Sequence, residues 1–447
     1  MTPIRQLRAL EQGPRWDLVV NGTSHSLRIP DQGGAEYVLA TLNNALCALA
    51  PSRIDLHCEP SADGPVAEAI ASLHALDNAS GVGILLKVAE RIHGKAPTIQ
   101  LHRRTSAGTP SEPPQANAPL PQRPTPQGLV VGIDIGGTDL KVVGLVGDEV
   151  VYTADPVWEL PPRDFESGFS YLEPLRRHVR AAKRAAGVPL AGVGVSFPDL
   201  VIDDEVVGGI TSKTVGMRNR TGGFTPAYWA VFDRTIRPLA RLLADDVGAP
   251  VRIVNDGVAV ASFGAAVMGG GSALTLSLGT SVAGASIDSQ GRVGPFPLYP
   301  GGIVIRVADE PNTAHRTTGM TGTVQQYPCQ GGIFRMLGER PDNARQRLKA
   351  LQHETSSAVH AAFTQAGQAL AETIAECRFW MGREAPDTTL LLGRLTEPSP
   401  QTGVLLRAAS TSGTTLIRGT ELEVPWPIEP QTLGQALGAA LMARGLA

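Results

Sequence analysis

Apolar and polar residues follow two spacings in the first hundred positions. Residues 16–20 and 24–29 alternate on either side of Asn21-Gly22, which predicts a β-hairpin. Residues 36–49 carry apolar side chains every three to four positions, which predicts a helix. Ser80 is expected to cap a second helix that carries Ile84 to Ile92. With short strands at 53–57 and 98–102, the pattern predicts a small α/β module over residues 1–104.

Residues 105–127 break both spacings. This segment contains seven prolines and almost no residue that would enter a core. Such a composition cannot bury enough apolar area to offset the entropy lost on ordering, so an extended, semi-rigid linker is expected. It separates the first module from residues 128–447.

After residue 128, short apolar runs alternate with Gly-rich turns and amphipathic stretches. The runs that predict strands are residues 129–135, 141–146, 193–197, 251–254, 274–278, 283–287 and 389–392. The stretches that predict helices are residues 171–186, 228–247, 344–375 and 435–443. Alternation of this kind indicates layered α/β architecture.

Composition narrows the function classes. The 447 residues include 39 Lys and Arg against 42 Asp and Glu, a net charge of −3, which argues against a protein dominated by attraction to nucleic acids or anionic membranes. Residues 1–104 carry ten basic and ten acidic side chains, whereas a DNA-reading head normally has a basic face. No apolar run approaches the ~20 residues that span a bilayer, and the N-terminus lacks a signal-peptide pattern, so a cytoplasmic location is expected.

The four cysteines do not form a recognisable metal or disulfide pattern. They are widely spaced and include no CxxC pair, so reduced, mostly buried thiols are expected. Their positions are Cys47, Cys58, Cys329 and Cys377.

The strongest chemical signal is the turn that follows the run at 129–135. Asp134 stands at the end of this run, and Gly136 and Gly137 tolerate positive φ and leave no side chain between backbone and ligand. Thr138 offers a hydroxyl, and the next strand starts near Lys141. Backbone N–H groups in such a turn can surround phosphate oxygens, and the carboxylate can hold Mg²⁺ through water. The alternative is an ordinary Gly-rich hairpin.

Two further segments fit the same chemistry. A second turn between two apolar strands contains Gly279, Thr280 and Ser281, which offer N–H and hydroxyl donors. By itself this turn is a weaker signal than the first. Between the two turns, an apolar strand ends in Asn255-Asp256 where a helix begins. Asp256 is therefore either a general base for an incoming hydroxyl or only a helix cap.

The order of these motifs resembles the ROK family (repressor, open reading frame, kinase) of the sugar kinase/Hsp70/actin superfamily. The DIGGT turn, the NDG strand end, the SLGTS turn and the tail at 432–440 occur in that order, over about residues 128–447. The resemblance implies a two-lobed, actin-like (ribonuclease H-like) α/β kinase fold. It places the first lobe at about 128–254 plus the helix at 433–447, and the second at about 255–432. ATP and Mg²⁺ are the implied cofactors.

The resemblance also implies roles for single residues. Asp134, which would hold Mg²⁺ through water, belongs with Gly136, Gly137, Thr138 and Lys141 to the first phosphate motif, and Gly279, Thr280 and Ser281 belong to the second. Asp256 matches the catalytic base and Asn255 a ligand of the substrate hydroxyl. Gly393 and Arg394 match the adenosine turn, although the family usually has Gly at the position of Arg394. This arginine would either stack on adenine or contact phosphate.

The chain departs from the family on the substrate side. At 299–306 the usual ELGH segment is missing, and the following loop has His315 but no cysteine cluster, so no structural zinc site is expected. A further glutamate of the family is replaced near Gln325 or Gln326. His315, Arg316 and Gln326 are candidate substrate contacts or loop surface.

A second group of candidates lies earlier in the chain. The carboxylate of Asp199 can accept hydrogen bonds from two substrate hydroxyls, and Thr214 follows it at the end of the 211–214 segment. Lys213 either pairs with an anionic substrate group or is a solvated lysine.

These observations predict ATP-dependent phosphorylation of a hydroxyl on a sugar, an amino sugar or a cyclitol-like polyol. Plain glucose is not the expected substrate, because the charged members of the family's glucose clamp are absent. The alternatives are a sugar-sensing transcriptional regulator, since ROK repressors share the fold, and a catalytically inactive scaffold. We expect a homodimer with a small-molecule substrate and no nucleic-acid or membrane partner.

Overall fold

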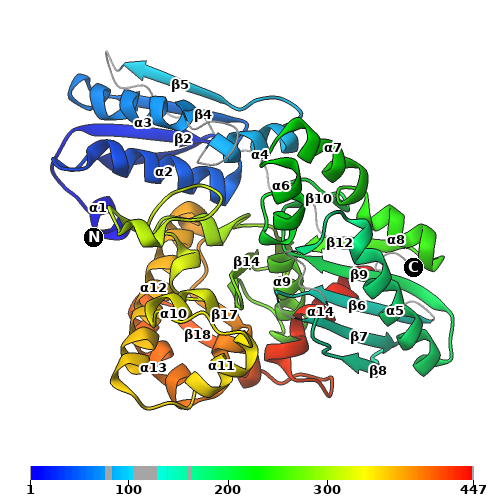
Figure 1. The fold of residues 1–447 in the computed structure, drawn as a ribbon. Helices are drawn as coiled ribbons and strands as arrows, with labels where there is room; N and C mark the ends of the chain where they lie inside the picture. The colour runs from blue at the N-terminus through cyan, green and yellow to red at the C-terminus, as the bar shows by residue number, and fades with distance from the viewer. Residues whose placement is uncertain (1, 76–82, 104–127, 138, 160–163, 445–447) are drawn as a thin grey trace.

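The computed structural model describes residues 2–75, 83–103, 128–137, 139–159 and 164–444 (Figure 1). The described residues form an N-terminal module and two lobes, each built around its own sheet. We call these sheets the module sheet, the first-lobe sheet and the second-lobe sheet.

The module sheet has four strands in the order β3-β2-β4-β5. Its strands are β2 (Arg15–Val20), β3 (Thr23–Arg28), β4 (Arg53–Cys58) and β5 (Thr98–Arg103). The predicted hairpin is confirmed, because Asn21 and Gly22 have φ of 50° and 80° at the turn between β2 and β3. The helices are α2 (Gly34–Leu49), α3 (Asp63–Ala75), which the sequence analysis missed, and α4 (Gly83–His93). The predicted cap Ser80 lies outside the described residues.

The first-lobe sheet has five strands in the order β12-β9-β6-β7-β8. Its strands are β6 (Leu129–Ile135), β7 (Leu140–Val146), β8 (Glu149–Ala154), β9 (Leu190–Phe197) and β12 (Val251–Asn255). β6, β9 and β12 run parallel, whereas β7 and β8 return antiparallel. Every residue of the central strand β6 is buried, as its continuous apolar run predicts. The predicted helix at 171–186 is α5 (Phe169–Ala186).

The second-lobe sheet also has five strands, in the order β15-β14-β13-β17-β18. Its strands are β13 (Ala273–Leu278), β14 (Val282–Ile287), β15 (Val293–Gly294), β17 (Thr388–Leu392) and β18 (Thr415–Arg418). β13 pairs antiparallel with β14 and parallel with β17. The chain between β14 and β17 includes α10 (Gln330–Met336) and the long helix α12 (Ser357–Met381), and α13 (Pro400–Ala409) precedes β18.

Two predicted helices are each two helices in the structure. The stretch at 228–247 is divided into α7 (Pro226–Thr235) and α8 (Leu239–Val247), because Pro238 has no N–H and its ring disfavours a continuous helix. The stretch at 344–375 is divided into α11 (Ala344–Leu351) and α12. Here Ser356 starts the new helix by accepting the backbone N–H of Val359 at 3.4 Å.

Two helices join the lobes at the centre of the molecule (Figure 1). The C-terminal helix α14 (Pro430–Ala443) packs on β6, β9 and β7 and against α9 (Asp256–Val267), which also packs on β14. A Cβ at residue 132 would lie 2.0 Å from the carbonyl oxygen of Ala436, and a Cβ at residue 194 would lie 1.9 Å from that of Ala439. Glycines at these two strand positions therefore let the helix backbone rest directly on the sheet.

All four cysteines are buried, as the sequence predicts. Among the described residues, no helix combines the length and apolar character needed to cross a bilayer.

Candidate active site

The carboxylate of Asp134 is held by three side chains at the end of β6. It is 2% exposed and accepts hydrogen bonds from Lys141 at 2.8 Å, Ser196 at 3.0 Å and Gln435 at 2.6 Å. The sequence analysis missed Ser196 and Gln435. Ser196 lies at the end of the neighbouring parallel strand, and Gln435 lies inside the tail motif, so both positions carried a usable signal.

Lys141 is a fixed cation beneath the first glycine turn. Its ammonium contacts Asp134 at 2.8 Å and Asp139 at 3.2 Å. Burial alone would lower the pKa of Lys141, but the two carboxylates outweigh it and raise the pKa to about 12. Lys141 therefore stays charged and holds the strand ends together. Thr138, the other polar member of this motif, lies outside the described residues.

The two glycine turns meet face to face. A Cβ at residue 137 would lie 2.4 Å from Thr280 Oγ1. Neither Gly136 nor Gly137 has positive φ, so the anticipated left-handed backbone is absent and the turn needs glycine for space. The second turn is closed by a hydrogen bond from the N–H of Gly279 to the carbonyl of Ser281 at 3.0 Å. The structure thus brings together the two segments that the sequence analysis treated as phosphate turns.

Asp256 starts helix α9, where the first-lobe sheet leads into the helix packed on the second lobe. Its Oδ1 accepts the N–H of Gly257 at 3.0 Å, and no other described residue hydrogen-bonds its second carboxylate oxygen. Burial, helped by the neighbouring charge of Asp134, raises the pKa of Asp256 to about 7 against the opposing effects of the Gly257 N–H and Lys213. A carboxyl group with this pKa can accept or hold a proton near neutral pH.

The N-cap of α9 is Asn255 rather than Asp256. The side chain of Asn255 accepts the N–H of Gly257 at 2.8 Å and donates to the carbonyl of Asp199 at 2.7 Å. Both ends of this amide therefore bond to the backbone, which orients the start of the helix that carries Asp256.

Lys213 is a buried side chain directed at the first turn. It is 6% exposed, and its ammonium donates to the carbonyl oxygen of Gly136. Burial lowers the pKa of Lys213 to about 8, although Asp134 and Asp256 act in the opposite direction. The alternative that Lys213 is a solvated surface lysine is therefore wrong, and its role towards a substrate stays a prediction.

The other predicted substrate ligands bond mostly to the protein itself. Both oxygens of Asp199 accept backbone N–H groups, from Leu200 at 2.8 Å and Gly209 at 2.9 Å, and burial raises its pKa to about 7. The hydroxyl of Thr214 donates to the carbonyl of Thr211 at 3.0 Å. Asp199 and Thr214 thus shape the loop that follows β9.

The residues that replace the ELGH region are divided between interior and surface. His315 is 2% exposed, and its Nε2 lies 3.1 Å from the Tyr299 hydroxyl, so it is not loop surface. Arg316 is exposed, and Gln326 contacts the carbonyl of Ala314 at 3.4 Å. Within the described ranges, no three His, Cys, Asp or Glu side chains are grouped so as to hold a metal ion.

Arg394 links the second lobe to the first. Gly393, with φ of 91°, turns the chain after β17, and the Arg394 guanidinium then pairs with Asp139 and, at 2.9 Å, with Asp155. Arg345 also contacts Asp155, at 2.6 Å. The contact of Arg394 with adenine or phosphate stays a prediction. No spacing in the sequence indicated this interlobe ion-pair cluster.

Comparison with known proteins identifies the fold. No protein-family model matches the chain, and no curated protein matches it. Among solved structures, a ROK family glucokinase from Streptomyces griseus in complex with glucose and AMPPNP is 18% identical with a TM-score of 0.50, covering 71% of this chain and 99% of that one. A ROK family transcriptional regulator, a homologue of the E. coli MLC protein, is 14% identical with a TM-score of 0.50, covering 71% and 78%.

A third solved structure, a ROK hexokinase from Thermus thermophilus, is 21% identical with a TM-score of 0.48 and covers 70% of this chain and 98% of that chain. The two structures with a TM-score of 0.50 show that the chain has the two-lobed α/β fold of the ROK sugar kinases, which confirms the fold expected from the motifs.

Proposed function

We propose that this protein transfers the γ-phosphoryl group of ATP to a hydroxyl of a sugar, an amino sugar or a cyclitol-like polyol. The observation that carries this proposal is the position of Asp256. A carboxyl group with a pKa near 7 starts a helix at the lobe junction, within the electrostatic reach of Asp134 and Lys213. Structural similarity to a glucokinase that binds AMPPNP supports ATP as the phosphoryl donor.

In the proposed reaction, Asp256 orients the acceptor hydroxyl and takes its proton. Phosphoryl transfer depends mainly on positioning and neutralisation of charge, and Lys213 supplies a buried cation on this side of the first turn. At pH values below its pKa of about 8, that cation is retained. We infer that these two residues act as a pair, one on the acceptor proton and one on the phosphate charge.

The residues of the two turns fit a triphosphate. Glycine places no side chain between the turns, and a Cβ at residue 137 would fill the space between them. Because Gly137 touches Thr280, binding a phosphate between the turns requires the lobes to move apart locally. Both oxygens of Asp134 already accept hydrogen bonds, so Mg²⁺ would contact it through water and would neutralise phosphate charge.

Arg218, Phe224 and Arg316 help to line a cavity of about 410 Å³, which we assign to the acceptor side. The Cζ atom of Arg218 lies 4.9 Å from the centroid of the Phe224 ring. The negative charge of Asp199 favours the charged form of Arg218 and so acts to raise its pKa. A hydroxyl-rich ring with polar substituents suits such a mixed aromatic and cationic wall better than an apolar ligand does.

A regulatory function is the second candidate, because the solved ROK regulator shares the fold. An ADP-release screen with Mg-ATP over sugars, amino sugars and cyclitols separates the two. The proposal expects at least one acceptor to stimulate ADP release and to appear as a phosphate ester. Lack of product with every acceptor, together with specific gel shifts on genomic DNA fragments, would favour the regulator.

A further inference from the structure

The N-terminal module, residues 2–103, contacts both lobes on one side of the molecule (Figure 1). Helices α1 (Ile4–Arg8) and α2 reach the second lobe, and α4 reaches the first lobe. Because α2 also packs on α3 and α4, the contacts to the two lobes belong to one packed unit.

The contact with the second lobe is a buried, peptide-like pairing. The side-chain amide of Asn44 accepts the N–H of Val304 at 2.6 Å and donates to the carbonyl of the same residue at 2.7 Å. Asn43 donates to the carbonyl of Gly302 at 2.9 Å, and both asparagines are fully buried. Buried amides left without partners are costly, so these bonds fix the register of the segment at 298–305, which we call the wall segment.

The wall segment borders the candidate site. Its first part is bonded to the end of α2, where the N–H of Tyr299 donates to the carbonyl of Cys47 at 2.8 Å. A Cβ at residue 301 would lie 3.1 Å from Ser281 Oγ, in the second glycine turn. Burial, the neighbouring Cys47 and the charge of Asp199 raise the pKa of Tyr299. The module therefore holds a segment that reaches the second glycine turn.

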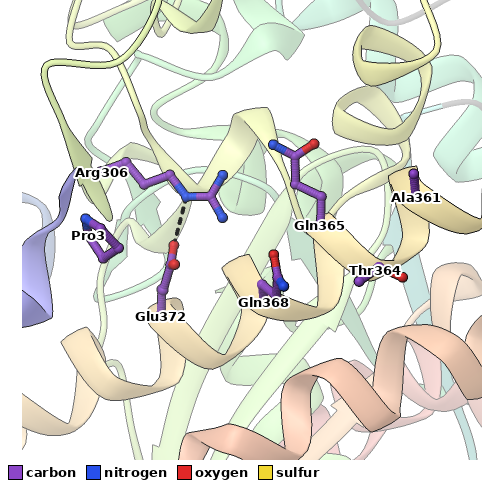
Figure 2. Close-up of a pocket in the computed structure, with 7 residues that line it drawn as sticks. All are labelled: Pro3, Arg306, Ala361, Thr364, Gln365, Gln368 and Glu372. Atoms are coloured by element: carbon purple, nitrogen blue, oxygen red, sulfur yellow. Dashed lines mark hydrogen bonds and ion pairs between the residues drawn. The ribbon is translucent and has the colours of Figure 1, made fainter. Parts of the chain in front are cut away.

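Further contacts anchor the module to helix α12. Glu376 is 1% exposed and accepts hydrogen bonds from Arg8 at 2.9 Å, Asn44 at 2.8 Å and Trp380 at 2.8 Å. The short strand β1 (Thr2–Pro3) pairs with β16 (Arg306–Val307), directly after the wall segment. Figure 2 shows Pro3 near Arg306, whose guanidinium is paired with Glu372 of α12 at 2.9 Å.

The contact with the first lobe is made by Arg91 of α4. Its Nε donates to the carbonyl of Val207 at 2.8 Å, its Nη2 pairs with Asp233 at 2.5 Å, and its guanidinium lies 4.4 Å from the Trp229 ring centroid. Val207 belongs to the loop at 199–209, in which Gly209 donates its N–H to Asp199. Arg91 thus holds the opposite side of the acceptor region.

We propose that the N-terminal module is an interlobe clamp on the acceptor side of the site, with Asn44 and Arg91 as positioning residues. Asn44 fixes the wall segment and Arg91 fixes the loop at 199–209. Because the module bridges the two lobes, it restricts their separation at the acceptor end. The effect on catalysis rests on the proposed kinase function, whereas the effect on local order does not.

The test compares three full-length proteins, the wild type, Arg91→Ala and the control Lys87→Ala. Lys87 lies on the same helix but pairs with Glu90 inside the module. Amide hydrogen exchange is measured over residues 199–209 and 298–305, followed by KM for the acceptor, KM for ATP and kcat. Losing charge-assisted hydrogen bonds predicts roughly tenfold to hundredfold faster exchange at 199–209 in Arg91→Ala and a similar rise in acceptor KM. We expect ATP KM to stay within about twofold.

The clamp is overturned if Arg91→Ala and Lys87→Ala show the same exchange and the same acceptor KM, or if ATP KM rises as much as acceptor KM. Arg91→Lys keeps the charge but loses the fork geometry, and we expect it to fall between the wild type and Arg91→Ala. If no alcohol is phosphorylated by the wild type, the kinase proposal fails while the exchange comparison still decides the clamp. Asn44→Ala provides the matching measurement at 298–305.

Discussion

Replacing Asp256 by Asn should stabilise the protein more at pH 8 than at pH 5, and should leave its stability nearly unchanged only near pH 3, below both pKa values of this carboxyl. The folded-state pKa of this carboxyl is raised from 3.8 to about 7 by burial and by the charge of Asp134. At pH values between these two pKa values, the folded protein binds more protons at Asp256 than the unfolded chain does. The free energy of unfolding therefore decreases as pH rises through this window.

The size of the effect follows from the shift. About three pKa units at 1.36 kcal/mol each correspond to about 4 kcal/mol of destabilisation once Asp256 is ionised, and this figure already includes the attraction of Lys213. We therefore expect Asp256→Asn to be about 1–4 kcal/mol more stable than the wild type at pH 8. Asn keeps an acceptor oxygen for the N–H of Gly257, so the start of the helix is preserved.

The assay is denaturant unfolding of the nucleotide-free protein at pH 5 and pH 8. Asp199→Asn is the matched control, because burial also raises its pKa to about 7 but both its oxygens accept backbone N–H groups. In Asp199→Asn the side-chain NH₂ group would face one of these backbone N–H groups, so two hydrogen-bond donors would meet. This variant should therefore lose stability at both pH values. A stability difference for Asp256→Asn that is equal at pH 5 and pH 8, or a loss at pH 8, would refute the reasoning.

Three further substitutions follow from the contacts. Gly137→Ala would place a methyl group against Thr280 and should weaken binding of Mg-AMPPNP by at least about tenfold in calorimetry, while an unchanged affinity would argue against the turn as a phosphate site. Arg394→Ala leaves the buried Asp139 with fewer cations and should lower stability by about 3 kcal/mol in thermal unfolding, whereas no loss would show that the interlobe pair is dispensable. Lys213→Met should lower kcat by about tenfold to a hundredfold in steady-state assays, and a full kcat would remove it from the proposed mechanism.

Local patterns predicted most of the architecture. The apolar run at 129–135 is strand β6, and Asn21-Gly22 is the hairpin turn, because short-range sterics and burial dictate both. The helix predicted at 228–247 was wrong in its continuity, although Pro238 was a readable signal. The edge strand β18 was missed, since a short, half-buried strand leaves little periodicity.

Contacts between segments that are distant in the chain were less predictable. The pair Arg394–Asp139 joins residues 255 positions apart, and the bonds from Asn44 to Val304 span 260. In the sequence, Asn44 is simply one polar residue of a predicted helix. Only the packed structure shows that its amide bonds both backbone groups of Val304, as a neighbouring strand would. The positions of Asp134 and Asp256 were predictable because strand ends in α/β sheets recur as ligand sites.

The central claim concerns the proton that Asp256 takes from the acceptor. With the best acceptor from the screen and saturating Mg-ATP, kcat of Asp256→Asn should fall by about 10²–10⁴, while calorimetry shows AMPPNP affinity within about twofold of the wild type. A variant that retains wild-type kcat, or one that loses nucleotide affinity in proportion to activity, would contradict the assignment of Asp256 as the general base.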